Sequence, residues 1–262
     1  METTHATSCP LNCWDVCGLK VTVKDGTVVR IDGDEQHPIT KGNICGRGRM
    51  LKERVNAKER RLYPLKKVNG QWIRVSWEEA LDDIAEKMRE LKERFGPTAV
   101  LHSHDYANNG LLKNLDRRFF NCYGGVTELV GSLCWGAGIE AQTWDFGNAY
   151  SHAPEDIDNS RHIVIWGRNV ARTNMHLFER LLRAKKRGAT IVVIDPLFGS
   201  TARIADRYVC VKPGMDAFLA MGIMKELLRL GLEDRSFIEQ HTIGFHDVEQ
   251  VLQTMSLKEI ER

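Results

Sequence analysis

The stretch CPLNCWDVCG, residues 9–18, and the stretch NICGRGR, residues 43–49, together carry four cysteines. These are Cys9, Cys13, Cys17 and Cys45, in the pattern C-x3-C-x3-C followed by 27 residues and C. Four thiolates, one for each iron, are the ligand set of a [4Fe–4S] cluster, and soft sulfur ligands favour Fe–S, Zn or Cu(I) over hard cations. The spacing therefore predicts a metal centre near the N-terminus, with an Fe–S cluster favoured.

A structural zinc site is the main alternative for the same cysteines. Zinc ribbons usually pair two close C-x2-4-C knuckles, whereas Cys45 has no cysteine near it in the sequence. Disulfide frameworks are typical of short secreted chains, but this chain has 262 residues and its first residues carry no export signal. Buried thiols without a ligand are common, yet the joint spacing of four favours a ligand set.

Composition and charge are those of an ordinary soluble globular protein. The sequence is 42% hydrophobic and 27% charged, and its net charge is +2, so no strong field indicates nucleic acid or membrane as a partner. The basic stretch at residues 41–67 is not interleaved with aromatics, as a single-strand binder would require. No apolar run reaches the roughly 18 residues of a membrane span. Seven cysteines without an export signal favour a cytoplasmic location.

Alternating and helical periodicities predict an α/β fold. Asp25-Gly26 between two alternating runs predicts a β-hairpin, preceded by a flexible lead at residues 1–8. Ser76 and Glu79 form a capping box for a helix that ends at Gly96. Further on, strands and helices alternate, which predicts a parallel sheet. We therefore expect a small antiparallel Fe–S domain followed by Rossmann-like parallel βα units.

The middle of the chain adds a buried strand at residues 98–103 and a helix at residues 110–123. The strand runs into His102 and His104, which share one strand face and therefore allow a metal site. As residues at the carboxyl end of a strand, they are better candidates for lining a ligand pocket. Cys122, in the helix, has the pattern of a buried structural cysteine, and so does Cys210.

Three strands in the last third end in glycine and polar residues. The strands are expected at residues 161–167, 189–196 and 206–213. Carboxyl ends of parallel strands meet at one edge of the sheet, so these ends predict a single crevice of the kind that binds nucleotides. The chain lacks G-x-G-x-x-G, which excludes a standard NAD fingerprint. An amphipathic helical stretch at residues 234–255 follows.

Two further residues, Arg47 and Cys134, are candidate functional residues. Arg47 follows Cys45 closely, and a cation beside a thiolate-bound cluster tunes its potential. Cys134 lies among small residues before a predicted helix, where a thiol has a lowered pKa and a large ligand can approach the backbone. A buried, unreactive cysteine is the alternative reading of Cys134.

The motifs together resemble the molybdopterin oxidoreductase family, the bis-pterin molybdenum and tungsten enzymes that include formate dehydrogenases and relatives of dimethyl sulfoxide reductase. The similar segments run in family order along nearly the whole chain: CPLNCWDVCG, DGTVVRIDGDEQHP, KGNICGRGR, RLYPL, SWEEALDDIA, LDRRFF, GSLCWGAG, IVIWGRN, IDP and KPGMDA.

The resemblance implies roles for individual residues. It implies a [4Fe–4S] cluster on the four cysteines and an electron route through Arg47 to the pterin. Cys134 falls at the position of the molybdenum or tungsten ligand. Contacts with a molybdopterin guanine dinucleotide are implied for Gly167, Asn169, Asp195, Gly214 and Asp216. The implied domains are a cluster domain at residues 1–62, an α/β domain with the metal-ligand loop at 63–152, and a pterin-dinucleotide domain at 153–262.

The resemblance covers the cluster domain and the first pterin-binding region of a longer family architecture. We therefore expect a split subunit, a truncated product or a fragment, with a complementary C-terminal subunit and an Fe–S or other electron-transfer partner. The leading hypothesis is a redox enzyme, in which His102, His104 and Trp135 line the substrate side. A non-catalytic Fe–S electron-transfer or assembly subunit and a zinc-stabilised α/β binding protein are the alternatives.

Overall fold

The computed structural model describes residues 1–104 and 114–256. It contains two compact units, one formed by residues 1–153 with 174–176 and the other by residues 154–173 with those from 177 onward. Antiparallel strands at the N-terminus are followed by parallel sheets, so the predicted α/β class is confirmed. The three-domain division remains a prediction.

The first unit begins with a three-stranded antiparallel sheet in the order β1-β2-β3. Its strands are β1 (Glu2–Ser8), β2 (Gly18–Lys24) and β3 (Thr27–Gly33). Asp25 and Gly26 both have positive φ, 48° and 78°, as a type I′ turn requires, so the predicted hairpin is confirmed. The expected flexible lead at residues 1–8 is wrong, because β1 pairs with β2 along its whole length.

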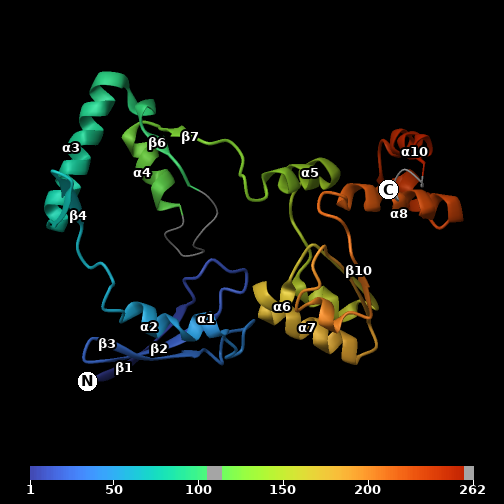
Figure 1. Ribbon diagram of the computed structural model, residues 1–262, viewed down its shortest axis with the longest axis horizontal. Coiled ribbons are helices and arrows are strands. Elements are labelled where there is room, and N and C mark those ends of the chain that lie inside the picture. The colour runs from blue at the N-terminus through green and yellow to red at the C-terminus, as the bar shows by residue number, and fades with distance from the viewer. Residues whose placement is uncertain (105–113, 257–262) are drawn as a thin grey trace. The chain divides into compact units, whose positions relative to one another are not determined.

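Two short helices lie along this sheet, α1 (Gly46–Arg49) and α2 (Leu51–Val55) (Figure 1). Leu51 packs with Cys17, Leu19 and Ile44 in a small core, where Leu19 is 1% exposed. The residues that flank the cysteines thus form the hydrophobic support of the cysteine segment.

A hairpin of β4 (Leu65–Val68) and β5 (Gln71–Arg74) leads into the long helix α3 (Trp77–Phe95). Both predicted ends of α3 are confirmed: Ser76 Oγ accepts a 3.0 Å hydrogen bond from Glu79 N, and Gly96 has a φ of 83°. The apolar stripe of α3 is exposed, however, with Trp77 at 61% and Leu81 at 59%. No residue of α3 is buried.

The rest of the first unit is built from short elements. They are η1 (Pro97–Ala99), β6 (Leu101–His102), α4 (Leu115–Tyr123), β7 (Thr127–Glu128) and α5 (Gly136–Phe146). β6 and β7 pair in parallel. The expected buried strand at residues 98–103 is wrong, since only Leu101–His102 is strand and Leu101 is 61% exposed. The expected helix is found from Leu115, and residues 110–113 lie outside the described range.

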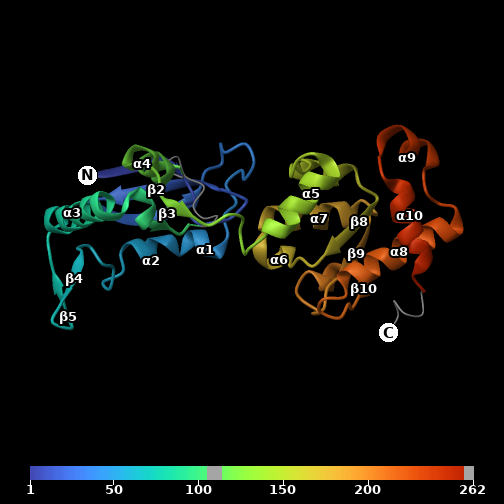
Figure 2. The same ribbon diagram turned by 90° about the horizontal axis from the view of Figure 1, so that it is seen from above.

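The second unit is a parallel sheet in the order β10-β9-β8, built from β8 (His162–Trp166), β9 (Thr190–Ile194) and β10 (Arg207–Val209). The connecting elements are η2 (Pro154–Asn159), α6 (Val170–Thr173), α7 (Met175–Lys186) and η3 (Ala202–Ile204). Ile163 and Ile191 of the sheet share a core with Leu181 of α7, and both views show α7 beside the strands (Figures 1 and 2).

Three helices follow β10: α8 (Asp216–Leu230), α9 (Arg235–His241) and α10 (Phe245–Thr254). The expected helical stretch at residues 234–255 is therefore two helices, interrupted before Gly244, whose φ is 76°. Cys122 and Cys210 are exposed, which corrects the expectation that they are buried.

Candidate functional site

The four cysteines of the first unit stand at the ends of its first elements. Cys9 follows β1 and Cys17 precedes β2, and Cys9 N donates a 2.8 Å hydrogen bond to Cys17 O that closes the intervening loop. Val16 has a φ of 39°, a strained value for a β-branched residue. Cys45 is the N-cap residue of α1.

The loop between β3 and Cys45 is fastened to the start of β2. Thr40 is 1% exposed, and its Oγ1 accepts a 3.3 Å hydrogen bond from Gly18 N and lies 3.0 Å from His37 Nδ1. At Gly33 a Cβ would collide with the backbone of Gly42, so the two chain segments touch there. Sequence reasoning missed Thr40 and Gly33, for which the only local signal was the turn-prone His37-Pro38.

The thiols influence one another electrostatically. Burial, together with the charges of Asp15 and of the other three cysteines, raises the pKa of Cys17 to about 12. Burial also raises the pKa of Cys9. At Cys45 burial acts in the same direction, but the backbone N–H groups of Gly48 and Arg47 and the Arg47 guanidinium outweigh it and lower the pKa.

This donor set suits a compact cationic metal core. Neighbouring thiolates repel one another, so without a metal the thiols keep their protons. An iron core supplies positive charge to all four sulfurs and thereby favours their thiolate forms. The charge of Arg47 acts against burial at both Cys9 and Cys45, because it stabilises each thiolate. The structure thus brings together Arg47 and the four predicted cysteines.

His176 is a contact that sequence reasoning missed. It stands in the first turn of α7 and belongs to the same compact unit as the cysteines. Its Nε2 lies 3.4 Å from Cys17 Sγ. A metal-bound thiolate has no proton to give, so the imidazole N–H is the donor when the cysteine is a ligand. No sequence pattern within residues 9–45 could have indicated it.

Cys134 lies in the first unit, in the loop before α5. Its backbone N–H donates to Ser132 Oγ at 3.1 Å, and its side chain is exposed. The alternative expectation that Cys134 is buried is therefore wrong. A Cβ at Gly138 would collide with the indole of Trp135, so this glycine lets the ring lie against α5.

In the second unit the predicted strand-end residues gather at the carboxyl edge of the sheet. Gly167 N donates to Ile194 O at 2.8 Å, and Trp166 Nε1–H donates to Asp216 Oδ1 at 2.6 Å. Asp195 Oδ1 accepts from Leu197 N at 2.8 Å. Asn169 and Gly214 belong to the same set of loops: Asn169 Oδ1 accepts from a threonine hydroxyl, and Gly214 has a φ of 85°.

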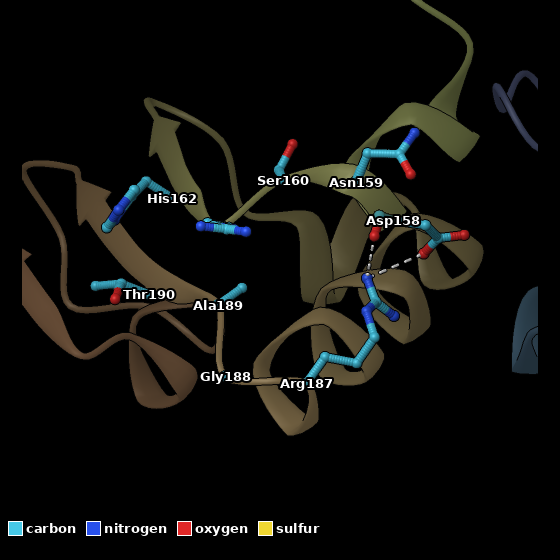
Figure 3. A pocket seen from close by; sticks show the side chains of 9 residues that line it. Asp158, Asn159, Ser160, His162, Arg187, Gly188, Ala189 and Thr190 are labelled. Atoms are coloured by element: carbon cyan, nitrogen blue, oxygen red, sulfur yellow. Dashed lines mark hydrogen bonds and ion pairs between the residues drawn. The ribbon is translucent and has the colours of Figure 1, made fainter.

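A cavity of about 360 Å³ lies at the opposite edge of this sheet. It is lined by the first residues of the strands, His162 and Thr190, together with Asp158 and Arg187 (Figure 3). Arg187 Nη2 donates to Asp158 O at 2.8 Å and lies 3.6 Å from Asp158 Oδ1, so a charged pair occupies one wall. None of the predicted site residues lines this cavity.

Comparison with protein families matches two family models to the chain. The molybdopterin oxidoreductase Fe4S4 domain matches residues 2–57, and molybdopterin oxidoreductase matches residues 60–250. The chain belongs to the molybdopterin oxidoreductase family. The family match supports a [4Fe–4S] cluster and molybdopterin as the cofactors, and the first model contains all four cysteines.

Individual relatives of the chain are longer. It is 62% identical to "Probable oxidoreductase YyaE" of Bacillus subtilis, over 99% of this chain and 39% of that protein. It is 30% identical to the F420-dependent formate dehydrogenase subunit alpha of Methanocaldococcus jannaschii, over 94% of this chain and 36% of the relative. Acetylene hydratase from Pelobacter acetylenicus superposes with a TM-score of 0.79 at 27% identity, covering 96% and 36% of the two chains.

The chain therefore spans less than two fifths of these relatives. Among its described residues, no helix combines the length and apolar character needed to cross a bilayer.

Proposed function

We propose that this chain forms the cluster-binding and first pterin-binding portion of the catalytic subunit of a molybdenum or tungsten oxidoreductase. The reaction is a two-electron oxidation or reduction of a small substrate, with electrons passing through the [4Fe–4S] cluster. The observation that carries this proposal is the convergence of four thiols beside Arg47, within the part of the chain that matches the Fe4S4 domain.

Cys9, Cys13, Cys17 and Cys45 would hold the cluster. Arg47 interacts with the Cys45 sulfur through both its backbone N–H and its guanidinium, which favours the thiolate form of this ligand. In the proposed enzyme Arg47 also provides the electron route from the cluster towards the pterin. A cation at this place offsets the negative charge of a thiolate-bound cluster and so eases its reduction.

The strand-end residues of the second unit would hold the guanine dinucleotide of the pterin. Asp195 and Asp216 each use one carboxylate oxygen in the contacts described above, and the second oxygen is an acceptor for N–H groups such as those of guanine. Gly167 and Gly214 have positive φ and no side chain, which lets the backbone approach a bulky ligand. Asn169 adds an amide at the same edge.

Cys134 would be the protein ligand of molybdenum or tungsten. Its exposed thiol, in a loop fixed by the Ser132 hydroxyl, has the accessibility that a metal ligand needs. The bound metal supplies the two-electron redox change of this family. Trp135, His102 and His104 are proposed to line the substrate side.

We further propose that a complementary C-terminal portion completes the site, that a separate Fe–S or other protein exchanges electrons with the cluster, and that the enzyme works in the cytoplasm. The relatives, at 36–39% coverage, supply the argument for the complementary portion. Expressing the chain with the corresponding C-terminal portion of such a relative and measuring co-purification tests it.

The direct test compares Cys134→Ala with Cys122→Ala, a matched change at another exposed cysteine. Each protein is purified anaerobically, together with whatever co-purifies, and analysed for Fe, Mo, W and pterin. We expect Cys134→Ala to lose Mo or W while about four irons and the EPR signal of the reduced cluster remain. Cys122→Ala should retain both metals. Equal Mo or W content in both variants would remove Cys134 from the site.

The same measurements test the alternative, a non-catalytic electron-transfer or assembly subunit. Such a protein would contain about four irons and a reducible cluster, but neither Mo, W nor pterin in any preparation.

A further inference from the structure

His102 lies between two carboxylates in the first unit. Its Nδ1 is 3.0 Å from Glu128 Oε1, and its Nε2 is 3.2 Å from Asp116 Oδ2. The imidazole is 13% exposed and packs against Phe120, with ring centroids 4.5 Å apart. Both ring nitrogens thus face an acceptor, so each contact requires a positive particle, either a proton or a metal ion.

The backbone places a further candidate metal ligand, His104, on the same side of this imidazole as Glu128. β6 and β7 pair in parallel with His102 opposite Glu128, which puts these two side chains next to each other. His104 lies two residues further along, and its ring stacks on that of His102 with centroids 4.6 Å apart. One ligand atom from each of His102, His104 and Glu128 lies within 4.8 Å of the others.

A shared proton explains the pair of His102 and Glu128, but it gives His104 no role. Two stacked imidazoles repel when both are protonated, whereas a metal ion uses a lone pair from each. Tetrahedral zinc with bonds of about 2.0–2.2 Å needs ligand atoms about 3.3–3.6 Å apart. The exposed His104 side chain can close the remaining gap by rotating.

Asp116 has the position of a supporting carboxylate. A histidine that binds a metal usually donates its other ring N–H to a carboxylate, which fixes the tautomer and orients the ring. Asp116 accepts from Nε2–H, leaving the Nδ1 lone pair directed at Glu128 and His104.

We propose that His102 Nδ1, His104 and Glu128 form a binding site for a divalent first-row transition metal of the zinc class. Two imidazoles, one carboxylate and an open fourth position for water are a known zinc ligand set. The ion would join the ends of β6 and β7, two strands of only two residues each, and through Asp116 it would reach α4. This site uses none of the four cluster cysteines. It shares His102 and His104 with the proposed substrate side, but Zn²⁺ binding is measured without turnover, so its failure and the failure of the proposed function are distinguishable.

The test uses the full chain with its cluster intact, purified anaerobically and freed of loosely bound metal. Zn²⁺ binding is measured by isothermal titration calorimetry, and zinc-edge X-ray absorption at one equivalent identifies the ligands without interference from iron. We expect one saturable site with imidazole and oxygen ligands and no sulfur. His104→Ala and Glu128→Gln, both at exposed side chains, should each weaken binding at least tenfold.

Asp116→Asn should weaken Zn²⁺ binding about 10–100-fold, as loss of a supporting carboxylate does. His5→Ala, at an exposed histidine of β1, is the matched control and should bind Zn²⁺ like the parent. Circular dichroism confirms that each variant is folded. Sulfur ligation would assign the zinc to cysteines and overturn the proposal, as would the absence of saturable binding or unchanged affinity in both His104→Ala and Glu128→Gln.

Discussion

Replacing Thr40 by valine should loosen the cysteine segment without changing its volume. Thr40 is 1% exposed, and its hydroxyl joins Gly18 N, at 3.3 Å, to His37 Nδ1, at 3.0 Å. Valine loses both hydrogen bonds and leaves the buried N–H of Gly18 without that acceptor. An unsatisfied buried donor costs roughly 1–3 kcal/mol, so we expect the free energy of unfolding to fall by about 2 kcal/mol.

The assay is anaerobic urea unfolding, followed by far-ultraviolet circular dichroism and by the visible absorption of the cluster. Thr4→Val is the matched control, because Thr4 makes its 3.3 Å contact with Thr22 on the exposed face of the sheet. An exposed change of this kind should stay within about 0.5 kcal/mol. Thr40→Ser, which keeps the hydroxyl, should retain most of the stability that Thr40→Val loses.

The reasoning is refuted if Thr40→Val lowers the unfolding midpoint no more than Thr4→Val. Thr40→Ser removes only the methyl group, so its loss of stability measures methyl packing separately from the hydrogen bonds that Thr40→Val removes.

Three further changes test the same site. Gly33→Ala places a methyl group against a backbone carbonyl and should destabilise the protein by about 3 kcal/mol, measured by urea unfolding; a neutral effect would contradict this close approach. In cluster-free protein, Arg47→Met should raise the pKa of Cys45, so the rate of Cys45 alkylation should begin to rise at a higher pH than in the parent protein. Arg49→Met should leave this pH profile of the alkylation rate unchanged. His176→Phe removes an N–H donor to the sulfur of a cluster ligand, Cys17, and should therefore lower the midpoint potential of the cluster. In an EPR-monitored redox titration we expect a shift of about 59 mV, which is a tenfold change in the ratio of reduced to oxidised cluster. An unchanged potential would exclude this hydrogen bond from the holoprotein.

Features determined by neighbouring residues could be predicted from the sequence. The Asp25-Gly26 turn and the Ser76 cap each depend on a few consecutive residues, and both are found as expected. β1 was missed because its side chains are exposed and mostly polar, so they carry no apolar pattern. Its position depends on pairing with β2, which the local sequence of residues 2–8 does not encode.

Contacts between distant residues limited what could be said of the site. Spacing indicated the four cysteines as a set, but it gave no means of finding Thr40 or His176, whose partners lie 22 and 159 residues away. The bond from Trp166 to Asp216 spans 50 residues in the same way. Helical periodicity located α3 correctly, yet it could not show that Trp77 and Leu81 stay exposed, because burial depends on what packs against a helix.

The position of the cysteine segment has a consequence for the order of events during synthesis. β1, β2, β3 and Cys45 all lie within the first 45 residues, and the sheet joins strands that are neighbours in the sequence. Such local topology folds quickly. The scaffold that presents the four thiols therefore depends on strand pairings that are near one another in the sequence, and residues synthesised after this segment are not needed to form those pairings.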